Sequence, residues 1–418
     1  MTQSLTEEPI NLYLLLVLAI ITAGYIFSFI VDKLNVSSAV PGLPEEFKGF
    51  YDGDKYAKAQ AYLKENTDFG LLTSGMFACI ELPFIILGGF NFADRIARGF
   101  GYGEIATGLI FAGLLLGAAQ ILKIPFSAHH TFGIEEKYGF NKTTVKTFIL
   151  DIIKSWALSA VIGGLVFALI LWFFMAAGGF AWVYCWIAVA LFEIFIVFIA
   201  PVTIMPLFNK FVPLEEGELR DSLQRYADSQ GFKLAGIYKM DGSKRSTKAN
   251  AFFTGFGRFK RIALFDTLIA KHTVDELVSI LAHEVGHFKK RHIAKSLLVS
   301  FLSSGLMFFI LSMFMNNPGL FAAFRMENIS IYASIIFFGF LYSPINSLIS
   351  VIANVFSRKW EYEADDFAAA SSGKREAFIN AMKKLSVDNL SNLTPHPLKV
   401  FLDYSHPPVL QRIERLKR

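Results

Sequence analysis

Charged side chains are scarce in this chain. Asp, Glu, Lys and Arg make up 18% of its 418 residues, whereas hydrophobic residues make up 54%, and the mean hydropathy is +0.45. Soluble domains carry about 25% charged residues, so this composition excludes two ordinary soluble domains and indicates a membrane protein. The formal net charge is only +5, and no Lys/Arg tract is interleaved with aromatic residues. We therefore expect no nucleic-acid partner.

Cysteine is nearly absent. The chain holds only Cys79 and Cys185, and both fall within hydrophobic runs, where we expect buried small side chains and no disulfide framework. Basic residues are missing from the opening MTQSLTEEP, and no small-residue cleavage site follows the first hydrophobic run. This segment is therefore predicted to stay as a membrane anchor instead of being removed as a signal peptide.

Long hydrophobic runs are what the sequence has in abundance. The hydrocarbon core of a bilayer is about 30 Å thick, and a helix needs roughly 20 apolar residues to cross it. Seven runs approach or exceed that length: residues 10–31, 70–92, 104–127, 148–176, 180–207, 294–315 and 331–356. The sequence therefore predicts an all-α, multi-pass integral membrane protein with about seven transmembrane helices in a lipid bilayer.

The segments between the runs differ in their basic content. Seven crossings place residues 32–69, 128–147, 208–293 and the tail from 357 on one side, and these segments hold most of the Lys and Arg. The opposite side receives the N-terminus and short loops with only Arg95, Arg98 and Arg325. The positive-inside tendency then places the basic side in the cytoplasm and the N-terminus on the opposite side.

Only two segments have the character of a soluble domain, and they suggest a four-part division. Residues 1–207 hold the first five spans, 208–293 a first soluble part, 294–356 the last two spans, and 357–418 a second soluble part. Within 208–293, EEGELRDSLQRYADSQGF has helical periodicity, LAGIYKMDGS and RIALFDTLI are strand-like, and KANAFFTGFGRFK is a strand candidate broken by glycines. Thr273 and Glu276 form a capping box that predicts a helix start. We expect a small α+β domain.

That helix carries LAHEVGHFKKRH, residues 281–292. His283 and His287 are one helical turn apart on one face, so both imidazoles can bind one metal ion, with Glu284 beside them. The alternative is an amphipathic helix with two solvated histidines, but a chance H-E-x-x-H is expected in only roughly one such sequence in a hundred. The small residue Gly286 leaves space for a substrate or a close helix. His292 lies outside the spacing and is expected at the surface.

A catalytic zinc ion normally has three protein ligands and an open fourth position. The segment WEYEADDF offers Glu361 and Asp365 one turn apart, so one carboxylate could bind the metal while the other steadies a ligating histidine. Glu363 is expected to point elsewhere, and an ordinary acidic helix remains the alternative. Two spans separate His287 from Glu361, so the chain crosses the membrane and returns to the same side.

The tail and the spans contribute further candidates. In YSHPPVLQRIERLKR, His406 could donate to an oxyanion and Arg412 could anchor a carboxylate, although the motif by itself is weak and an exposed turn is the default interpretation. Glu81 and Glu193 lie near the middle of their spans, where a charge facing lipid would cost several kcal/mol, so we expect both to face inward. A hydrated chamber and a structural polar pair both account for them.

Together, LAHEVGH, EYEAD, NAFFTG and YSHPP resemble the motifs of the type I CAAX prenyl endopeptidases, which are integral-membrane zinc metalloproteases. HHTFGIEEKYGFNKTT and the seven spans extend the resemblance over essentially the whole chain. It implies a hollow barrel of transmembrane helices around a water-filled chamber, with a zinc-metalloprotease domain built from the loop between the fifth and sixth spans and the C-terminal tail.

The resemblance also implies roles for individual residues. One Zn²⁺ per chain would be bound by His283, His287 and Glu361, with Glu284 as general base and Asp365 supporting a ligand. Asn250 would lie beside the catalytic centre, and the strand that continues through Ala251 and Phe252 would pair with substrate backbone. His406 and Arg412 would support the transition state and the ligands.

The function so predicted is hydrolysis of peptide bonds in peptide or protein substrates, either near the C-terminus of prenylated CAAX-type substrates or in other membrane-associated ones. One alternative is a membrane-protein quality-control protease of the HtpX kind, whose chains are shorter with fewer spans. Another is a transporter or non-catalytic scaffold, although the richest set of polar residues lies outside the membrane. The sequence does not decide the oligomeric state, and a monomer is the default expectation.

Overall fold

The computed structural model describes residues 11–40, 42–254 and 261–418. Helices dominate this part of the chain, and seven stretches of helix are long and apolar enough to cross a membrane, as the sequence predicted. They are Leu12–Ser37 (α1), Gly53–Ile86 (α2), Glu104–Glu135 (α4 with η2), Val145–Ala176 (α5 and α6), Gly178–Phe208 (α7 with short flanking turns), His292–Phe314 (α12) and Ile331–Ser372 (α14).

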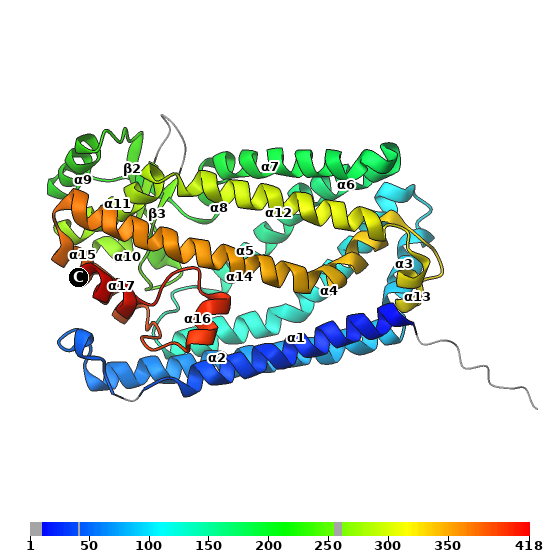
Figure 1. The fold of residues 1–418 in the computed structure, drawn as a ribbon, viewed down its shortest axis with the longest axis horizontal. Coiled ribbons are helices and arrows are strands. Elements are labelled where there is room, and N and C mark those ends of the chain that lie inside the picture. The colour runs from blue at the N-terminus through cyan, green and yellow to red at the C-terminus, as the bar shows by residue number, and fades with distance from the viewer. Residues whose placement is uncertain (1–10, 41, 255–260) are drawn as a thin grey trace, which may run out of the picture.

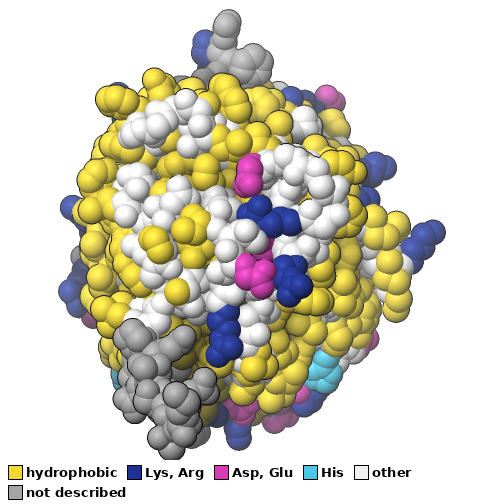
Figure 2. Space-filling view, turned by 90° about the vertical axis from the view of Figure 1, so that its right-hand side faces the viewer, with side chains coloured by type: hydrophobic (Ala, Val, Ile, Leu, Met, Phe, Trp, Pro, Cys, Tyr) yellow, Lys and Arg dark blue, Asp and Glu magenta, His cyan; other side chains and the backbone are white. Residues whose placement is uncertain are grey.

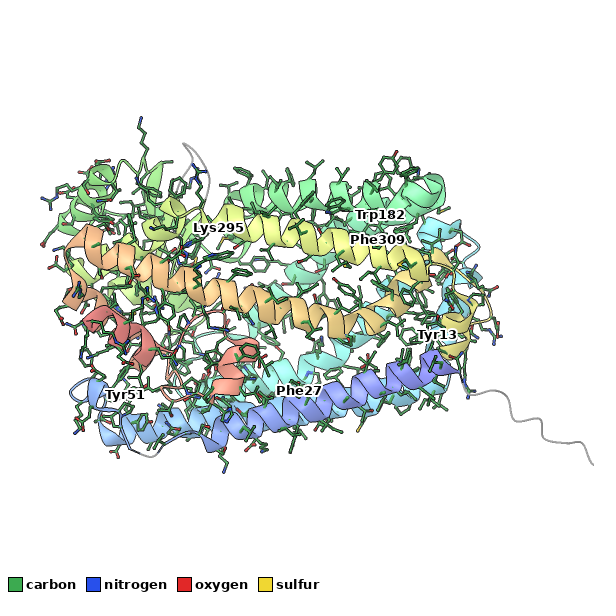
Figure 3. The ribbon with its side chains drawn as sticks, viewed as in Figure 1. Tyr13, Phe27, Tyr51, Trp182, Lys295 and Phe309 are labelled. Atoms are coloured by element: carbon green, nitrogen blue, oxygen red, sulfur yellow. The ribbon has the colours of Figure 1, made fainter. Side chains whose placement is uncertain are left out.

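The long helices run lengthwise in an elongated bundle (Figure 1). Helix α1 lies along α2, α7 lies along α12, and α14 contacts both α1 and α12. Trp182 of α7 stands against Phe309 of α12 at the far end of that pair (Figure 3), with ring centroids 5.3 Å apart. Many large apolar side chains on these helices are exposed, among them Phe27 and Leu302, as expected for surfaces that face lipid.

Packed side chains gather at the two ends of the bundle. At one end, α3 (Gly89–Gly99) and α13 (Pro318–Ala323) cover the helices, and the rings of Phe324 and Phe337 stack 3.9 Å apart. Charged side chains are few on this end (Figure 2). Between the ends, only 6% to 17% of the residues in the apolar stretch of each span are buried. The spans therefore bury little of their surface against one another, as expected for a hollow helical barrel.

A small mixed domain closes the other end. Its sheet contains β1 (Phe211–Pro213), β2 (Gly236–Met240), β3 (Ala251–Thr254) and β4 (Arg261–Phe265), in the order β1-β2-β4-β3. Strands β2 and β4 are parallel, and β3 is antiparallel to β4 with Phe252 opposite Ala263. The expected strands at 234–243 and 261–269 and the helix within 215–232 (α9, Glu218–Ser229) are thus found. Strand β3 lies at the edge of this sheet.

The domain's remaining helices share one apolar core with the sheet. They are α10 (Asp266–Ile269), α11 (Val274–Lys289), α15 (Arg375–Asp388) and α17 (Val409–Lys417), whereas α16 (Pro397–Asp403) packs outside this core against α14 and α1. The core includes Leu223 of α9, Ile262 of β4, Leu281 of α11 and Ile413 of α17. The two soluble segments of the sequence therefore fold together although two membrane crossings separate them.

Three details differ from the expectations. Helix α2 begins at Gly53 instead of residue 70, because Asp52 caps it and its polar first half continues beyond the apolar part. Helix α14 continues without a break through the expected boundary at residue 356 and ends at Gly373, which has a φ of 64°. Cys79 is exposed on its span, whereas Cys185 is buried as expected. The second half of the strand candidate KANAFFTGFGRFK, at 255–260, lies outside the described residues.

Candidate metal centre

Helices α11 and α14 cross in close contact, and this crossing positions the site. Thr273 caps α11 through the predicted capping box, in which its side chain and that of Glu276 bind each other's backbone N–H groups. At the crossing, a Cβ atom on Gly286 would lie 3.1 Å from the backbone of Ala364. Gly286 is therefore needed for the approach of a helix, which is one of the two roles that the sequence allowed.

The crossing brings together two histidines of α11 and one glutamate of α14. Nε2 of His283 lies 3.0 Å from Nε2 of His287. The carboxylate of Glu361 reaches both rings, with Oε2 3.4 Å from His283 Nε2 and Oε1 3.2 Å from His287 Nε2. These three residues are the one group of possible metal ligands found within the described ranges.

The donor set fits a zinc ion. Zn–N and Zn–O distances of about 2.0–2.1 Å in a tetrahedron place neighbouring ligand atoms about 3.3 Å apart, and each of the three contacts is close to this value, with Glu361 presenting a different oxygen to each histidine. Oε2 of Glu361 is buried and accepts no hydrogen bond from the residues that the structure describes, although Nη2 of Arg412 lies 3.6 Å away. A buried carboxylate oxygen without a donor is disfavoured unless cations lie close to it, and a metal ion would add its charge to that of Arg412. The arrangement can therefore hold a divalent metal ion.

Asp365 and Arg412 support this group from behind. Asp365 Oδ1 lies 2.9 Å from Nδ1 of His283, on the side of the ring away from His287. Arg412 donates two hydrogen bonds to Asp365, from Nε to Oδ2 at 2.8 Å and from Nη2 to Oδ1 at 2.6 Å. Burial lowers the pKa of His283, but the carboxylates of Asp365 and Glu361 outweigh it and raise the pKa to about 9. The surroundings of this ring thus attract positive charge.

A second supporting pair was missed from the sequence. His292, expected at the surface, is buried, with its Nδ1 3.0 Å from Nδ1 of His287 and its Nε2 3.2 Å from Glu363. The expectation failed because Arg291 adopts a left-handed conformation, φ 58°, which reverses the chain and brings His292 back to His287. Glu363 therefore also takes part in the site. Each histidine candidate ligand has a polar side chain close to its other ring nitrogen, as metal-binding histidines usually do, although the 2.9 Å contact of His283 with Asp365 lacks hydrogen-bond geometry.

A cavity of about 780 Å³ opens beside these residues. Glu284 lines it, and burial raises the pKa of this carboxyl group. Ala251 and Phe252 of β3 also line it, whereas Asn250 is exposed and contributes nothing to the lining. His406 lies at the cavity with its side chain 64% exposed and its Nε2 3.3 Å from Glu361 Oε1. The structure therefore gathers every predicted site residue except the side chain of Asn250 around one cavity or behind it.

Comparisons with known proteins agree with this arrangement. Residues 33–210 match the family model of the CAAX prenyl protease N-terminal domain with five membrane helices, and residues 213–418 match that of peptidase family M48. The CAAX prenyl protease 1 homolog of Oryza sativa subsp. japonica is 33% identical, over 97% of each chain. The chain belongs to peptidase family M48, among the CAAX prenyl proteases.

A second relative and a solved structure also match. The CAAX prenyl protease 1 of Saccharomyces cerevisiae is 36% identical over 75% of this chain and 72% of its own. The crystal structure of S. mikatae Ste24p superposes with a TM-score of 0.93 at 31% identity and covers 98% of this chain and 100% of that one.

Membership in family M48 decides between the enzyme, transporter and scaffold functions that the sequence left open. The protein is a multi-pass membrane metallopeptidase, so the prediction of an enzyme is confirmed and the transporter or scaffold is set aside. The match over nearly the full length of relatives named CAAX prenyl protease 1 favours that type over a shorter protease of the HtpX kind.

Proposed function

We propose that this peptidase is a zinc endopeptidase with His283, His287 and Glu361 as its three ligands. The observation that carries the proposal is the cluster of donor atoms beside a cavity: the two Nε2 atoms lie 3.0 Å apart, and Glu361 directs Oε2 to His283 at 3.4 Å and Oε1 to His287 at 3.2 Å. Two histidines with one carboxylate form a common ligand set of catalytic zinc, with one position left for water or substrate.

The proposed reaction needs one general base. When bound, zinc polarises the scissile carbonyl and lowers the pKa of a water molecule in the site. Glu284 accepts the proton of the attacking water on its carboxylate and returns it to the leaving amine. His406, whose Nε2 lies beside Glu361 at the cavity, donates a hydrogen bond to the oxygen that becomes negative. Arg412 keeps Asp365 in place behind His283.

The proposed substrates are membrane-associated proteins with a prenylated CAAX-type C-terminus. This choice rests on the relatives, which are named CAAX prenyl proteases. Edge strand β3 offers Ala251 and Phe252 at the cavity, and backbone pairing with such an edge binds an extended peptide with little dependence on its side chains. The lipid bilayer is then the second partner of the enzyme.

The proposed orientation puts the catalytic end in the cytoplasm. The soluble domain and the basic segments share one end of the bundle, and the other end has α3, which contains Arg95 and Arg98, and α13, which precedes Arg325 (Figure 1). Lys295 follows the site on α12 (Figure 3), and its ammonium lies 5.8 Å from the ring of Trp360. Such a Lys and Trp pair is typical of the membrane interface.

A cleavage assay tests the proposal. Purified protein in detergent is incubated with a prenylated CAAX peptide and with its unprenylated twin, with and without a zinc chelator. We expect cleavage of the prenylated peptide near its C-terminus, its loss with chelator, and its recovery on adding Zn²⁺. Cleavage that survives complete removal of metal would refute the zinc mechanism, and equal cleavage of both peptides would refute prenyl selectivity.

The variant Glu284→Gln separates metal binding from catalysis. We expect it to keep its zinc, measured by elemental analysis, and to lose at least about 100-fold in kcat, because the water loses its proton acceptor. A zinc-replete Glu284→Gln protein with undiminished turnover would remove Glu284 from this role.

A further inference from the structure

The catalytic cavity extends away from the metal ligands toward the middle of the membrane helices. Three spans each line it with one stripe of side chains: Phe192, Glu193, Ile196 and Val197 on α7; Ile293, Ser296, Leu297 and Ser300 on α12; and Ser357, Trp360 and Glu361 on α14. The walls of this extension are mainly apolar. Among the side chains with which the membrane helices line this cavity, Glu193 and the proposed ligand Glu361 are the two carboxylates.

We infer that Glu193 determines specificity by binding a basic side chain, Lys or Arg, of the peptide substrate. The inference rests on the proposed function, because it assigns a substrate contact within the same cavity. Glu193 is half-buried, and one of its carboxylate oxygens accepts a hydrogen bond from Ser300 at 2.8 Å. No lysine or arginine lines the cavity in the ranges that the structure describes.

A carboxylate in this position favours a cationic partner. Removing a charge from water within the membrane costs several kcal/mol unless another charge or water compensates it. The Ser300 hydroxyl supplies one hydrogen bond, whereas a carboxylate can accept about four, so the group keeps unused acceptor capacity toward the cavity. An ammonium or guanidinium group of the substrate would donate charge-assisted hydrogen bonds to these free acceptor positions of the carboxylate.

The geometry of α12 sets which substrate residue reaches Glu193. Ser300 lies eight residues beyond His292, whose ring contacts His287, and eight residues of helix span about 12 Å. An extended peptide advances about 3.3 Å per residue, so this distance corresponds to three or four residues. The predicted contact is therefore a basic residue three or four positions from the scissile bond.

A purely structural role for Glu193 makes a different prediction. The bond between Glu193 and Ser300 connects α7 to α12, so Glu193 could simply hold two helices together. In that case glutamine, which also accepts a hydrogen bond from Ser300, would preserve every property of the enzyme. Charge selectivity is the property that separates the two roles.

The test compares kcat/KM for matched peptides. Prenylated peptides carry Lys, norleucine or Glu at single positions, two to five residues from the scissile bond on its N-terminal side and two or three residues from it on its C-terminal side. For the wild-type enzyme we expect Lys at the third or fourth position to exceed norleucine by about tenfold, the usual effect of one charge-assisted contact, and Glu to be the poorest. The ratio of Lys to norleucine should fall to near one in Glu193→Gln and invert in favour of Glu in Glu193→Lys.

Two control variants show whether a loss of Lys preference is due to the Glu193 carboxylate. Ser300→Ala should retain the Lys preference, because it leaves the carboxylate in place. Glu81→Gln should also retain it, since Glu81 is another half-buried carboxyl group in a span but lies outside this cavity. A wild-type enzyme that cleaves all three peptides equally, or a Glu193→Gln enzyme that keeps the preference, would overturn the inference alone. Failure to cleave any prenylated peptide would reject the proposed substrate class and this inference with it.

Discussion

At the scale of single residues, the strength of metal binding should depend on groups that do not touch the metal. Arg412 binds Asp365 with two hydrogen bonds, and Asp365 lies 2.9 Å from the outer nitrogen of His283. This series of contacts fixes the orientation of the imidazole ring and raises its basicity. Loss of such an outer partner typically weakens metal affinity by about 10- to 100-fold.

Asp365→Asn tests this dependence. We expect zinc affinity to fall by about 10- to 100-fold, measured by competition with a chromogenic chelator, because the amide no longer attracts positive charge to His283. The matched control is Asp366→Asn, whose carboxylate is 51% exposed and pairs with Arg415 on the outside of the domain. If both variants bind zinc as the wild type does, Asp365 has no role in metal binding.

The sequence located the candidate ligands by two different signals. His283 and His287 share a helix face by spacing alone, whereas spacing left Glu361 and Asp365 both open, the even number of spans only allowed a joint site, and the family resemblance selected Glu361. His292 and Glu363 could not be found in this way, because their role depends on the left-handed conformation of Arg291. A non-glycine residue with positive φ leaves no clear signal in one sequence. Asn250, named by resemblance, is exposed and adds nothing to the cavity lining.

At the scale of elements, the site depends on how closely α11 approaches α14. Gly286→Ala would place a methyl group 3.1 Å from the backbone of Ala364, which cannot rotate away as a side chain could. We expect the helices to separate by a few tenths of an ångström and the protein to lose about 1–3 kcal/mol of stability, with weaker zinc binding. Thermal unfolding and zinc competition measure the two effects.

The control for this substitution is Gly117→Ala. Gly117 is also within a helix, but a Cβ atom there meets nothing within 4 Å. The same change should therefore be neutral or slightly stabilising, because alanine favours helix more than glycine does. A Gly286→Ala protein that matches this control in both stability and zinc affinity would show that the close approach is not required.

A second link between elements connects the membrane helices to the edge strand. Lys248, just before β3, places its ammonium 3.0 Å from Glu135 of η2 (His130–Glu135) and 2.8 Å from the hydroxyl of Tyr62 on α2. Asn389 binds both backbone groups of Ala249, at 3.2 and 3.3 Å. These bonds fix the strand that we propose pairs with substrate.

Glu135→Gln should therefore impair substrate binding more than chemistry. We expect KM to rise about three- to tenfold, as for the loss of one charge-assisted contact, with kcat and zinc content nearly unchanged. Steady-state kinetics with the prenylated peptide measure the split, and Glu136→Gln, at an exposed neighbouring position, is the control. A fall in kcat with unchanged KM would contradict a role in positioning β3.

The sequence predicted some helices and strands more accurately than others. Hydropathy located seven spans because the bilayer imposes a minimum apolar length, and the capping box located the start of α11 at Thr273. The start of α2 was missed by 17 residues, from 70 to 53, because its first half is polar and extends outside the apolar stretch. Strand β1 has only three residues, too few for alternation to be visible.

At the scale of the whole molecule, the catalytic domain is assembled from two segments that the membrane hairpin α12 and α14 joins. Its core combines residues of the first segment, such as Leu281, with residues of the second, such as Phe378 and Ile413. The bound metal would add a connection across the same division, since two ligands come from α11 and one from α14. Metal binding should therefore stabilise the assembled domain as well as enable catalysis.

Zinc removal should for this reason lower the melting temperature of the soluble domain. A ligand that binds only the folded state stabilises it by about 2.7 kcal/mol at a free concentration 100 times its Kd, which corresponds to several degrees for a domain of this size. The measurement is thermal unfolding of metal-free protein before and after addition of Zn²⁺. Glu361→Gln removes the one proposed ligand from α14. Addition of zinc should therefore raise the melting temperature of this variant far less than that of the wild type. If zinc raises the melting temperature of this variant as much as that of the wild type, then α14 supplies no ligand, and the two segments are held together by their apolar core alone.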